Sequence, residues 1–300
     1  MPASSSVNSP ASTASKIWCP NLPGASAARL VEQREFDGIA DLSEAFPLKV
    51  FPDTVGISGE GRENLLPYGS MVFNGFGPRN DLFDKAMANA GPVREWIMSK
   101  CSRAALAPDG LGMQIFQAVD SGELSEAEAG MLVRSFLSAG VDTTVYGLGN
   151  ALYCLTRYPE QWRALRENPA LIRGAFEEVL RFEAPVQSFF RTTTRAVEVG
   201  GVRLGDGEKV MLLFAAANRD PRRWERPDTF DVSRRATGHM TFGTGIHGCV
   251  GQAVARLETE AVLSALVKRV ASFEFTSEPQ QRLNNTLRGF DTLPLRVKPV

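Results

Sequence analysis

The chain has 300 residues, of which 43% are apolar and 18 are phenylalanine, enough to bury a sizeable core. Its 33 basic and 34 acidic side chains give a net charge of −1, which argues against a protein that binds nucleic acid or a membrane surface through bulk charge. Four cysteines without a C-x-x-C pair and only two histidines exclude a zinc ribbon, a disulfide scaffold and a multi-histidine metal site. The longest apolar run, residues 210–217, is too short to cross a bilayer, so we expect a cytoplasmic protein.

The N-terminal part of the chain is compositionally unusual. Twelve of the first 15 residues are Ser, Thr, Pro or Ala, so we expect residues 1–25 to be disordered or foreign to the fold. One domain is expected over residues 26–300, and its first hundred residues resemble helices broken by proline and glycine. Ser125 and Glu128 then form a capping-box pattern before a mostly apolar helix over 126–157, which its four glycines should weaken and kink.

The second half of the chain alternates helical and β patterns. Helices are predicted over 159–167 and 169–182, the second with Asn168 as its N-cap. Strand patterns over 186–199 and 202–214 flank the turn Gly200–Gly201. A loop with four glycines, 242–251, precedes a last helix predicted from about Cys249 to Val270. The sequence therefore predicts a mainly α fold with small β-sheets.

The chemistry of the glycine-rich loop depends on Cys249, in the pattern F-x-x-G-x-x-x-C-x-G. A thiol at the start of a helix meets the positive end of the helix dipole and free backbone N–H groups, and both favour the thiolate. For an isolated cysteine at this place, a buried helix starter in a glycine-rich turn would be the favoured interpretation. The whole pattern, with His247 two residues before the cysteine, is much harder to obtain by chance.

This loop resembles the haem-ligand loop of the cytochrome P-450 family. The resemblance implies that Cys249 gives its thiolate to the iron of haem b (iron protoporphyrin IX), that His247 reaches a haem propionate and that Phe242 packs near the thiolate. Arg191, in Phe-Phe-Arg-Thr-Thr-Thr, matches the strand arginine that pairs with a propionate, a role for which guanidinium offers a planar fork of donors.

A second motif of the family is E-x-x-R, here Glu178 to Arg181. Residues three apart share a helix face and can form an ion pair. Glu160 and Arg163 match the same motif, but Glu178 lies 71 residues before Cys249, near the family's roughly 70, and Glu160 lies 89 before it. The resemblance implies a third, structural partner, for which Arg234 is the candidate, although an arginine there could also lie on a solvated loop.

The segment from Ala139 to Thr144 resembles the oxygen-activation segment of the family. The resemblance implies that Gly140 opens the helix where it faces the haem, and that Thr143 and Asp142 are the catalytic residues that bond oxygen and deliver protons. The alternative is structural, because a hydroxyl in mid-helix often bonds to the carbonyl four residues earlier.

The match covers residues 26–300 and is closest to bacterial members that oxidise para-substituted benzoates, such as 4-methoxybenzoate demethylases. It implies that a small aromatic acid is hydroxylated or O-demethylated with O₂ and with electrons from a ferredoxin and its NAD(P)H-dependent reductase, by a monomer. The implied substrate pocket comprises Phe73, Phe76, Ser135, Ser138, Val186 and Phe189. Each of its aromatic residues could instead belong to an ordinary core.

Family members run to roughly 400 residues, so we expect this chain to lack about the N-terminal quarter of the fold. Two alternatives to an active monooxygenase follow. One is an inactive truncated remnant that at most binds haem or a protein. The other is a helical interaction module without a cofactor, which would leave Cys249 and Thr143 without a role.

Overall fold

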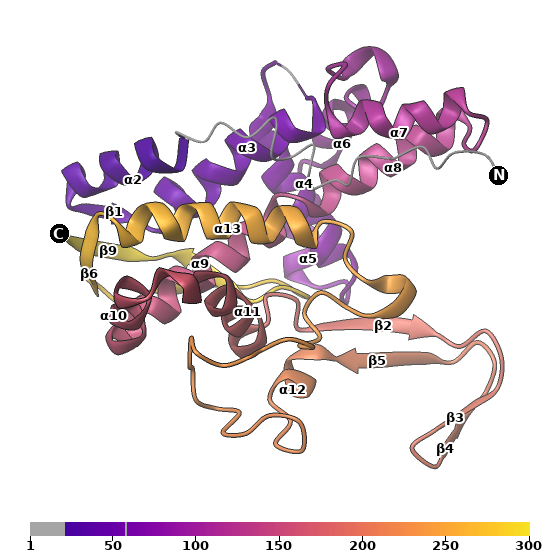
Figure 1. Ribbon diagram of the computed structural model, residues 1–300. Helices are drawn as coiled ribbons and strands as arrows, with labels where there is room; N and C mark the ends of the chain where they lie inside the picture. The colour runs from indigo at the N-terminus through magenta and orange to yellow at the C-terminus, as the bar shows by residue number, and fades with distance from the viewer. Residues whose placement is uncertain (1–21, 58) are drawn as a thin grey trace, which may run out of the picture.

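The computed structural model describes residues 22–57 and 59–300 (Figure 1). Its helices are α2 (Leu22–Gln33), α3 (Ala45–Val55), α4 (Leu65–Gly75), α5 (Asp81–Met87), α6 (Ala90–Ser99), α7 (Leu111–Asp120), α8 (Glu126–Ala139), α9 (Asp142–Arg157), α10 (Pro159–Glu167), α11 (Ile172–Glu183), α12 (Phe214–Asn218) and α13 (Gln252–Val267). A π-helical turn at Ile39–Glu44 precedes α3, and 3₁₀ turns lie at Arg62–Asn64, Arg103–Ala105, Pro169–Leu171 and Gly245–His247.

The start of α2 bears on the expected disorder of residues 1–25. Residues 1–21 lie outside the described part of the chain, but residues 22–25 form the first turn of this helix, so these four are helical and not disordered. The helix begins with a leucine followed by proline, which is favourable in a first helical turn. Its inner face, through Ala27 and Leu30, belongs to the main core.

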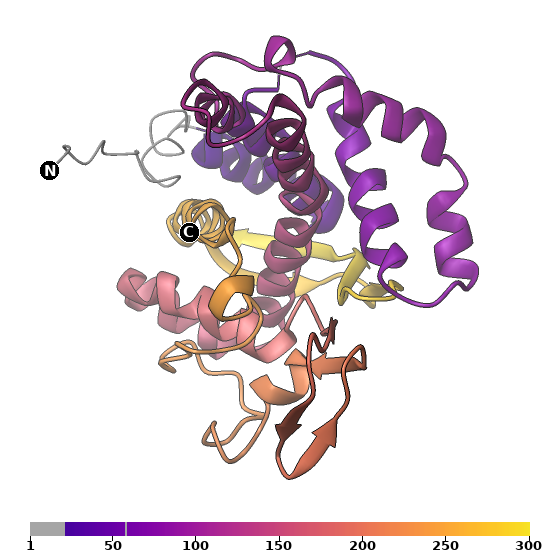
Figure 2. The ribbon, with the colours of Figure 1, turned by 90° about the vertical axis from the view of Figure 1, so that its right-hand side faces the viewer.

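The helix predicted over 126–157 is present as two helices with a break at Gly140 and Val141. The predicted capping box is confirmed: the Ser125 hydroxyl accepts from the Glu128 amide, and the Glu128 carboxylate accepts from the Ser125 amide. The helix α9 runs through the middle of the molecule (Figure 2), and 13 of its 16 residues are buried. This central helix is the scaffold against which the other elements pack.

The break between α8 and α9 has a steric cause that the sequence did not show. A Cβ atom on Gly140 would lie 2.0 Å from the Phe51 ring, so only glycine lets α3 approach this closely. The bulky group next to the predicted kink is therefore a side chain of the fold's own core.

Helices α10 and α11 follow nearly as predicted. The first has the predicted bounds, but the second begins with a 3₁₀ turn, and Asn168 makes no side-chain cap. The last helix, α13, begins at Gln252 and ends at Val267, so the prediction that it spans Cys249 to Val270 is wrong at both ends. Cys249 lies in the loop before it, and Val270 is the first residue of a strand.

The strands of the described residues form four small antiparallel sheets. Their bounds are β1 (Glu35–Asp37), β2 (Ser188–Thr192), β3 (Val197–Val199), β4 (Val202–Leu204), β5 (Lys209–Leu213), β6 (Val270–Phe275), β7 (Gln280–Arg282), β8 (Gly289–Thr292) and β9 (Pro294–Pro299). The order β1-β9-β6 makes one sheet, and β2-β5, β3-β4 and β7-β8 pair separately. The predicted turn joins β3 to β4, and both of its glycines have positive φ, 58° and 79°, as a type I′ hairpin requires.

The main core lies between α9, the three-stranded sheet and the surrounding helices α3, α4, α8, α10, α11 and α13. In Figure 1, the ribbon β2–β5 and the hairpin β3–β4 extend away from this core. Within the described residues, no helix is both long and apolar enough to span a membrane. The fold is mainly α with small β-sheets, as the sequence predicted.

Candidate active site

The loop around Cys249 is shaped by its glycines. Gly243 has φ +67°, and a Cβ there would lie 2.7 Å from the His247 carbonyl oxygen. The loop closes where the Cys249 amide donates to the Phe242 carbonyl at 2.8 Å. This conformation presents Cys249 as an exposed residue, whereas Cys101 and Cys154 are buried.

The Cys249 thiol accepts hydrogen bonds from the backbone amides of Gly251 and Gln252. Desolvation raises the thiol's pKa above its usual value, and these amides together with the Arg256 charge only partly oppose that rise. The expectation that a helix start and free backbone N–H groups favour the thiolate agrees in direction with these two amides, but desolvation outweighs them for the free thiol. A positive partner at the sulfur, such as a metal ion, would instead lower the pKa of the Cys249 thiol and favour the thiolate.

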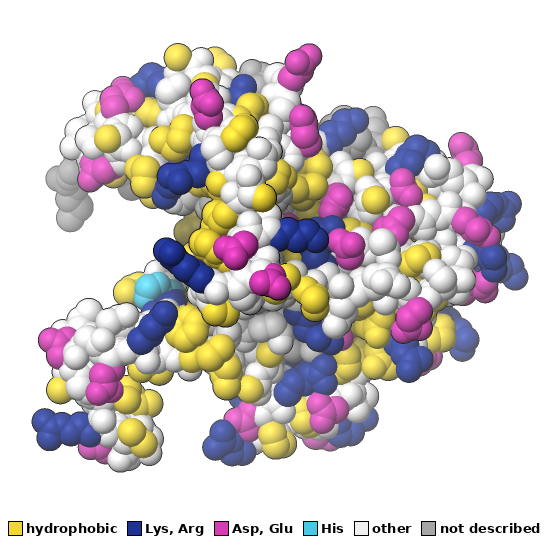
Figure 3. Space-filling view, turned by 180° about the vertical axis from the view of Figure 1, so that it is seen from behind, with side chains coloured by type: hydrophobic (Ala, Val, Ile, Leu, Met, Phe, Trp, Pro, Cys, Tyr) yellow, Lys and Arg dark blue, Asp and Glu magenta, His cyan; other side chains and the backbone are white. Residues whose placement is uncertain are grey.

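Two adjoining cavities, of about 280 and 250 Å³, meet at Cys249. Phe242, Thr143 and Ala139 line both cavities, so the cysteine faces the break in the central helix. Seen from behind, the molecule is deeply hollowed on one side, with hydrophobic side chains in the hollow (Figure 3).

The residues around these cavities fit the haem that the sequence predicted. Arg191 and His247 line the larger cavity together with Cys249, so the two predicted propionate partners are on the same side as the predicted iron ligand. Gly140 lines the smaller cavity. A thiol, apolar walls and the cationic or polar side chains of Arg191 and His247 in one lining are what a flat, apolar ring with two carboxylates requires.

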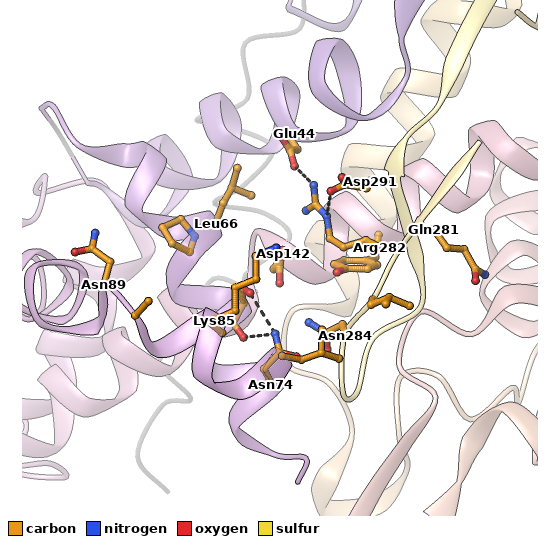
Figure 4. Close-up of a pocket in the computed structure, with 17 residues that line it drawn as sticks. Glu44, Leu66, Asn74, Lys85, Asn89, Asp142, Gln281, Arg282, Asn284 and Asp291 are labelled. Carbon is orange, nitrogen blue, oxygen red and sulfur yellow. Dashed lines mark hydrogen bonds and ion pairs between the residues drawn. The ribbon is translucent and has the colours of Figure 1, made fainter. Parts of the chain in front are cut away.

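Thr143 and Asp142 are neighbours in the first turn of α9, but they face different cavities. Thr143 lines both cavities at Cys249, and its hydroxyl donates to the Ala139 carbonyl at 2.7 Å, which is the structural alternative considered for this residue. Asp142 lines a third cavity, of about 630 Å³, on another face of the helix (Figure 4). The structure therefore does not bring this predicted catalytic pair together in one cavity.

The Glu178 carboxylate lies at the centre of a buried ion-pair network. Arg181 donates to it through Nε at 2.7 Å and Nη2 at 2.8 Å, and both side chains are fully buried. Arg234 adds a third contact at 3.1 Å, so the partner chosen from the sequence is confirmed. The alternative match, Glu160 and Arg163, lies on the exposed face of α10.

Comparison with known proteins gives the same family as the resemblance found in the sequence. The family model "Cytochrome P450" matches residues 99–299. Cytochrome p450 CYP199A2 of Rhodopseudomonas palustris is 53% identical over 263 residues, 88% of this chain and 64% of that protein. Cytochrome P450 107B1 of Saccharopolyspora erythraea is 36% identical over 274 residues, 89% of this chain and 66% of that protein. The chain belongs to the cytochrome P450 family.

Solved structures of P450s have the same fold. The crystal structure of P450BioI in complex with an acyl carrier protein ligated to hexadec-9Z-enoic acid matches with a TM-score of 0.85 and 28% identity, covering 97% of this chain and 76% of that one. This chain spans a little less than two thirds of the length of the two curated relatives described above.

A second charged cluster behind the cysteine loop of this P450 was not found from the sequence. Glu177 pairs with Arg256 through Nε and with His239 at 3.1 Å. The Arg256 guanidinium in turn lies over the Phe242 ring, 4.7 Å from its centroid. Burial raises the pKa of Glu177, but hydrogen bonds from His239 and Arg256 outweigh it and lower this pKa to about 2. The one feature of the sequence that could have pointed to this cluster is that His239 is one of only two histidines.

The aromatic residues expected to form the substrate pocket pack against each other. Phe73 and Phe76 meet edge to face at 6.0 Å, and Phe76 and Phe189 do so at 5.4 Å. Phe73, Phe189 and Val186 line the larger cavity at Cys249. Phe76 is 48% exposed and does not line that cavity.

The two serines of the expected substrate pocket lie on α8 and bond to its own backbone. The Ser135 hydroxyl donates to the Met131 carbonyl at 2.9 Å, and the Ser138 hydroxyl donates to the Ser135 carbonyl at 2.8 Å. Ser135 lines the smaller cavity, whereas Ser138 lines neither of the two. The structure thus brings part of the predicted pocket to Cys249.

Proposed function

We propose that this chain is the haem-binding part of a P450 monooxygenase that inserts one atom of O₂ into a small aromatic acid, by hydroxylation or O-demethylation of a para-substituted benzoate. The observation that carries the proposal is the position of Cys249. Among the described cysteines it is the exposed one, and it lies where two apolar cavities meet opposite Thr143.

In this proposal, the residues at the two cavities hold the haem. Cys249 would hold the iron of haem b, and Arg191 and His247 would hold its propionates by charge-assisted hydrogen bonds. Phe242 would pack beside the sulfur, backed by the Arg256 guanidinium. When bound, the haem supplies O₂ binding and one-electron chemistry, with electrons from a ferredoxin and its NAD(P)H-dependent reductase.

The break between α8 and α9 supplies the polar groups of the site. The Thr143 hydroxyl is held by the Ala139 carbonyl, so its oxygen can accept a further hydrogen bond from the cavity. Asp142 holds a proton on the other face of the helix, where burial raises its pKa to about 7. An acid with this pKa is partly protonated at neutral pH and suits proton delivery.

Removal of the Thr143 hydroxyl tests its proposed role in catalysis. Thr143→Ala should keep consuming reducing equivalents while releasing more hydrogen peroxide and less product. Thr156→Ala is a matched control, since Thr156 makes the same hydroxyl-to-carbonyl bond at 2.7 Å farther along α9 and away from the cavities. Equal product per electron in the two variants would show that the Thr143 hydroxyl is only structural.

The proposed substrate class depends on the aromatic wall of the larger cavity. The Phe73 and Phe189 rings can pack on a planar ring, and aromatic pairs of this kind contribute about 0.5–1.5 kcal/mol beyond area burial. A spectral titration of the haem-loaded protein with 4-methoxybenzoate and with a fatty acid tests the proposal. The benzoate should bind more tightly, and tighter binding of the fatty acid would contradict the aromatic-acid assignment while leaving the family unaffected.

A further inference from the structure

A cluster of three titratable side chains lies behind the cysteine loop, where α11 packs against α13. Its members are Glu177, His239 and Arg256, and none of them lines either cavity at Cys249. All three are largely buried, with exposed fractions of 16%, 3% and 25%. The haem contacts of the proposed function leave the charges of this cluster unused, although burying charged groups costs desolvation free energy.

Arg256 uses its whole guanidinium group to connect the two helices with the loop. Its Nε and Nη2 atoms both bond to the Glu177 carboxylate of α11, and its Nη1 donates to the Gln252 side chain at 2.8 Å. The guanidinium carbon lies 4.7 Å from the centroid of the Phe242 ring, within the range of a cation–π contact. Three different contacts therefore fix the place of this positive charge.

Two of these contacts lead to Cys249. The backbone amide of Gln252 donates to the thiol, and the Phe242 carbonyl accepts from the Cys249 amide at 2.8 Å. The Arg256 charge also acts on the sulfur itself and favours its anionic form. The lining residues of the two cavities include no Asp or Glu among the described part of the chain. Arg256 is thus a positive charge near the sulfur that no carboxylate opposes from the cavity side.

Glu177 opposes this positive charge from behind the loop. His239 is its second donor, and the Thr241 amide donates to Nδ1 of this histidine at 3.2 Å. In the neutral ring the proton therefore lies on Nε2, which donates to the Glu177 carboxylate at 3.1 Å. This hydrogen bond supports the anionic form of Glu177 without adding a charge of its own.

We propose that the ion pair between Arg256 and Glu177 sets the reduction potential of the haem that Cys249 binds, with Arg256 raising this potential and Glu177 lowering it. Reduction adds one electron, supplied by the ferredoxin of the proposed function, and neither makes nor breaks a bond. A nearby positive charge favours this gain of negative charge, and a nearby negative charge opposes it. Arg256 is a positioning residue, because it acts through Phe242 and the sulfur. The inference rests on the haem of the proposed function but not on its substrate.

The chain offers a matched control in a second ion pair between the same two helices. Arg173 lies one turn before Glu177 on α11, and Glu260 lies one turn after Arg256 on α13, and these two residues pair at 3.6 Å. Their side chains are 79% and 33% exposed, so solvent screens this pair more than the first. Glu260 is also one helical turn farther from the cysteine loop. Breaking this pair removes a contact between α11 and α13 without removing a charge beside Phe242.

The experiment measures the midpoint potential of substrate-free, haem-loaded protein by spectroelectrochemical titration with dithionite, at one pH and ionic strength. The reduced carbon monoxide spectrum first verifies that the haem is thiolate-ligated in each variant. Arg256→Gln should lower the potential and Glu177→Gln should raise it, each by roughly threefold in the reduction equilibrium, or about 28 mV at 59 mV per tenfold. Arg173→Gln and Glu260→Gln should keep the wild-type potential.

Two further variants separate the charge of the pair from its structural role. Arg256→Lys keeps the charge but loses the planar fork, so it should retain most of the wild-type potential. Combining Glu177→Gln with Arg256→Gln removes both charges and should return the potential towards that of wild type. A pair that only held the helices together would give shifts of the same sign in the two single variants, or none, and neither rescue.

Shifts of the same sign in Arg256→Gln and Glu177→Gln, or an unchanged potential in Arg256→Gln, would overturn the proposal. If Arg256→Gln fails to bind haem, an unchanged or lowered potential in Glu177→Gln would overturn it alone. These measurements need neither substrate nor turnover. A wild-type protein without thiolate-ligated haem would instead contradict the proposed function.

Discussion

The buried network around Glu178 allows a quantitative test of what holds this P450 fold together. In Glu178→Gln the fully buried Arg181 guanidinium keeps its charge and loses its carboxylate partner. Breaking a buried ion pair from one side costs about 3–5 kcal/mol. An unfolding entropy of about 2.1 cal/mol/K per residue gives roughly 0.6 kcal/mol/K for 300 residues, so the melting temperature should fall by roughly 5–8 °C.

The assay is urea and thermal unfolding of proteins with equal haem content, and the chain contains its own control. Glu160→Gln alters the second E-x-x-R match, whose residues are exposed on α10. A surface change of this kind should stay within about 0.5 kcal/mol of wild type. If Glu178→Gln loses no more stability than Glu160→Gln, the assignment of the buried network as a structural centre is refuted.

Two further predictions concern stability. Gly140→Ala should cost about 1–3 kcal/mol in urea unfolding because its Cβ meets the Phe51 ring, and Phe51→Leu should recover part of the loss; an unaffected single variant would contradict this steric account. His239 and Arg256 hold the pKa of Glu177 near 2, below its ordinary 4.5, so the stability from this carboxylate is complete above about pH 5 and is lost as the pH falls towards 2. In a plot of unfolding free energy against pH, Glu177→Gln should therefore reduce the loss of stability between about pH 5 and pH 2. An unchanged loss in this variant would exclude the Glu177 cluster as its origin.

Spacing along the chain predicted the parts of the site that depend on local geometry. The loop pattern placed Cys249, and the separation of 71 residues chose Glu178 over Glu160. The capping box correctly predicted where α8 begins, and the two-glycine turn correctly predicted the hairpin of β3 and β4. Both could be predicted because each depends on only a few adjacent residues. Arg234 was a correct choice among several arginines because the resemblance gave its order in the chain.

Contacts between distant elements could not be predicted in this way. The approach of Phe51 to Gly140 depends on how α3 crosses the central helix, which no local pattern encodes. The direction of Asp142 depends on a break of two residues, since each residue added to a helix turns the next side chain by about 100°. The ion pair between Glu44 and Arg282 joins residues more than 200 positions apart in the chain, so it became visible only in the folded structure.

The central claim, that Cys249 is the axial ligand, is tested most directly by the absorption spectrum of the reduced protein with carbon monoxide. Wild type loaded with haem should show the Soret band of a thiolate-ligated haem, and Cys249→Ala should lose it. Cys101→Ala and Cys154→Ala alter buried thiols away from the two cavities and should keep the band. A thiolate spectrum that persists in Cys249→Ala would contradict the account.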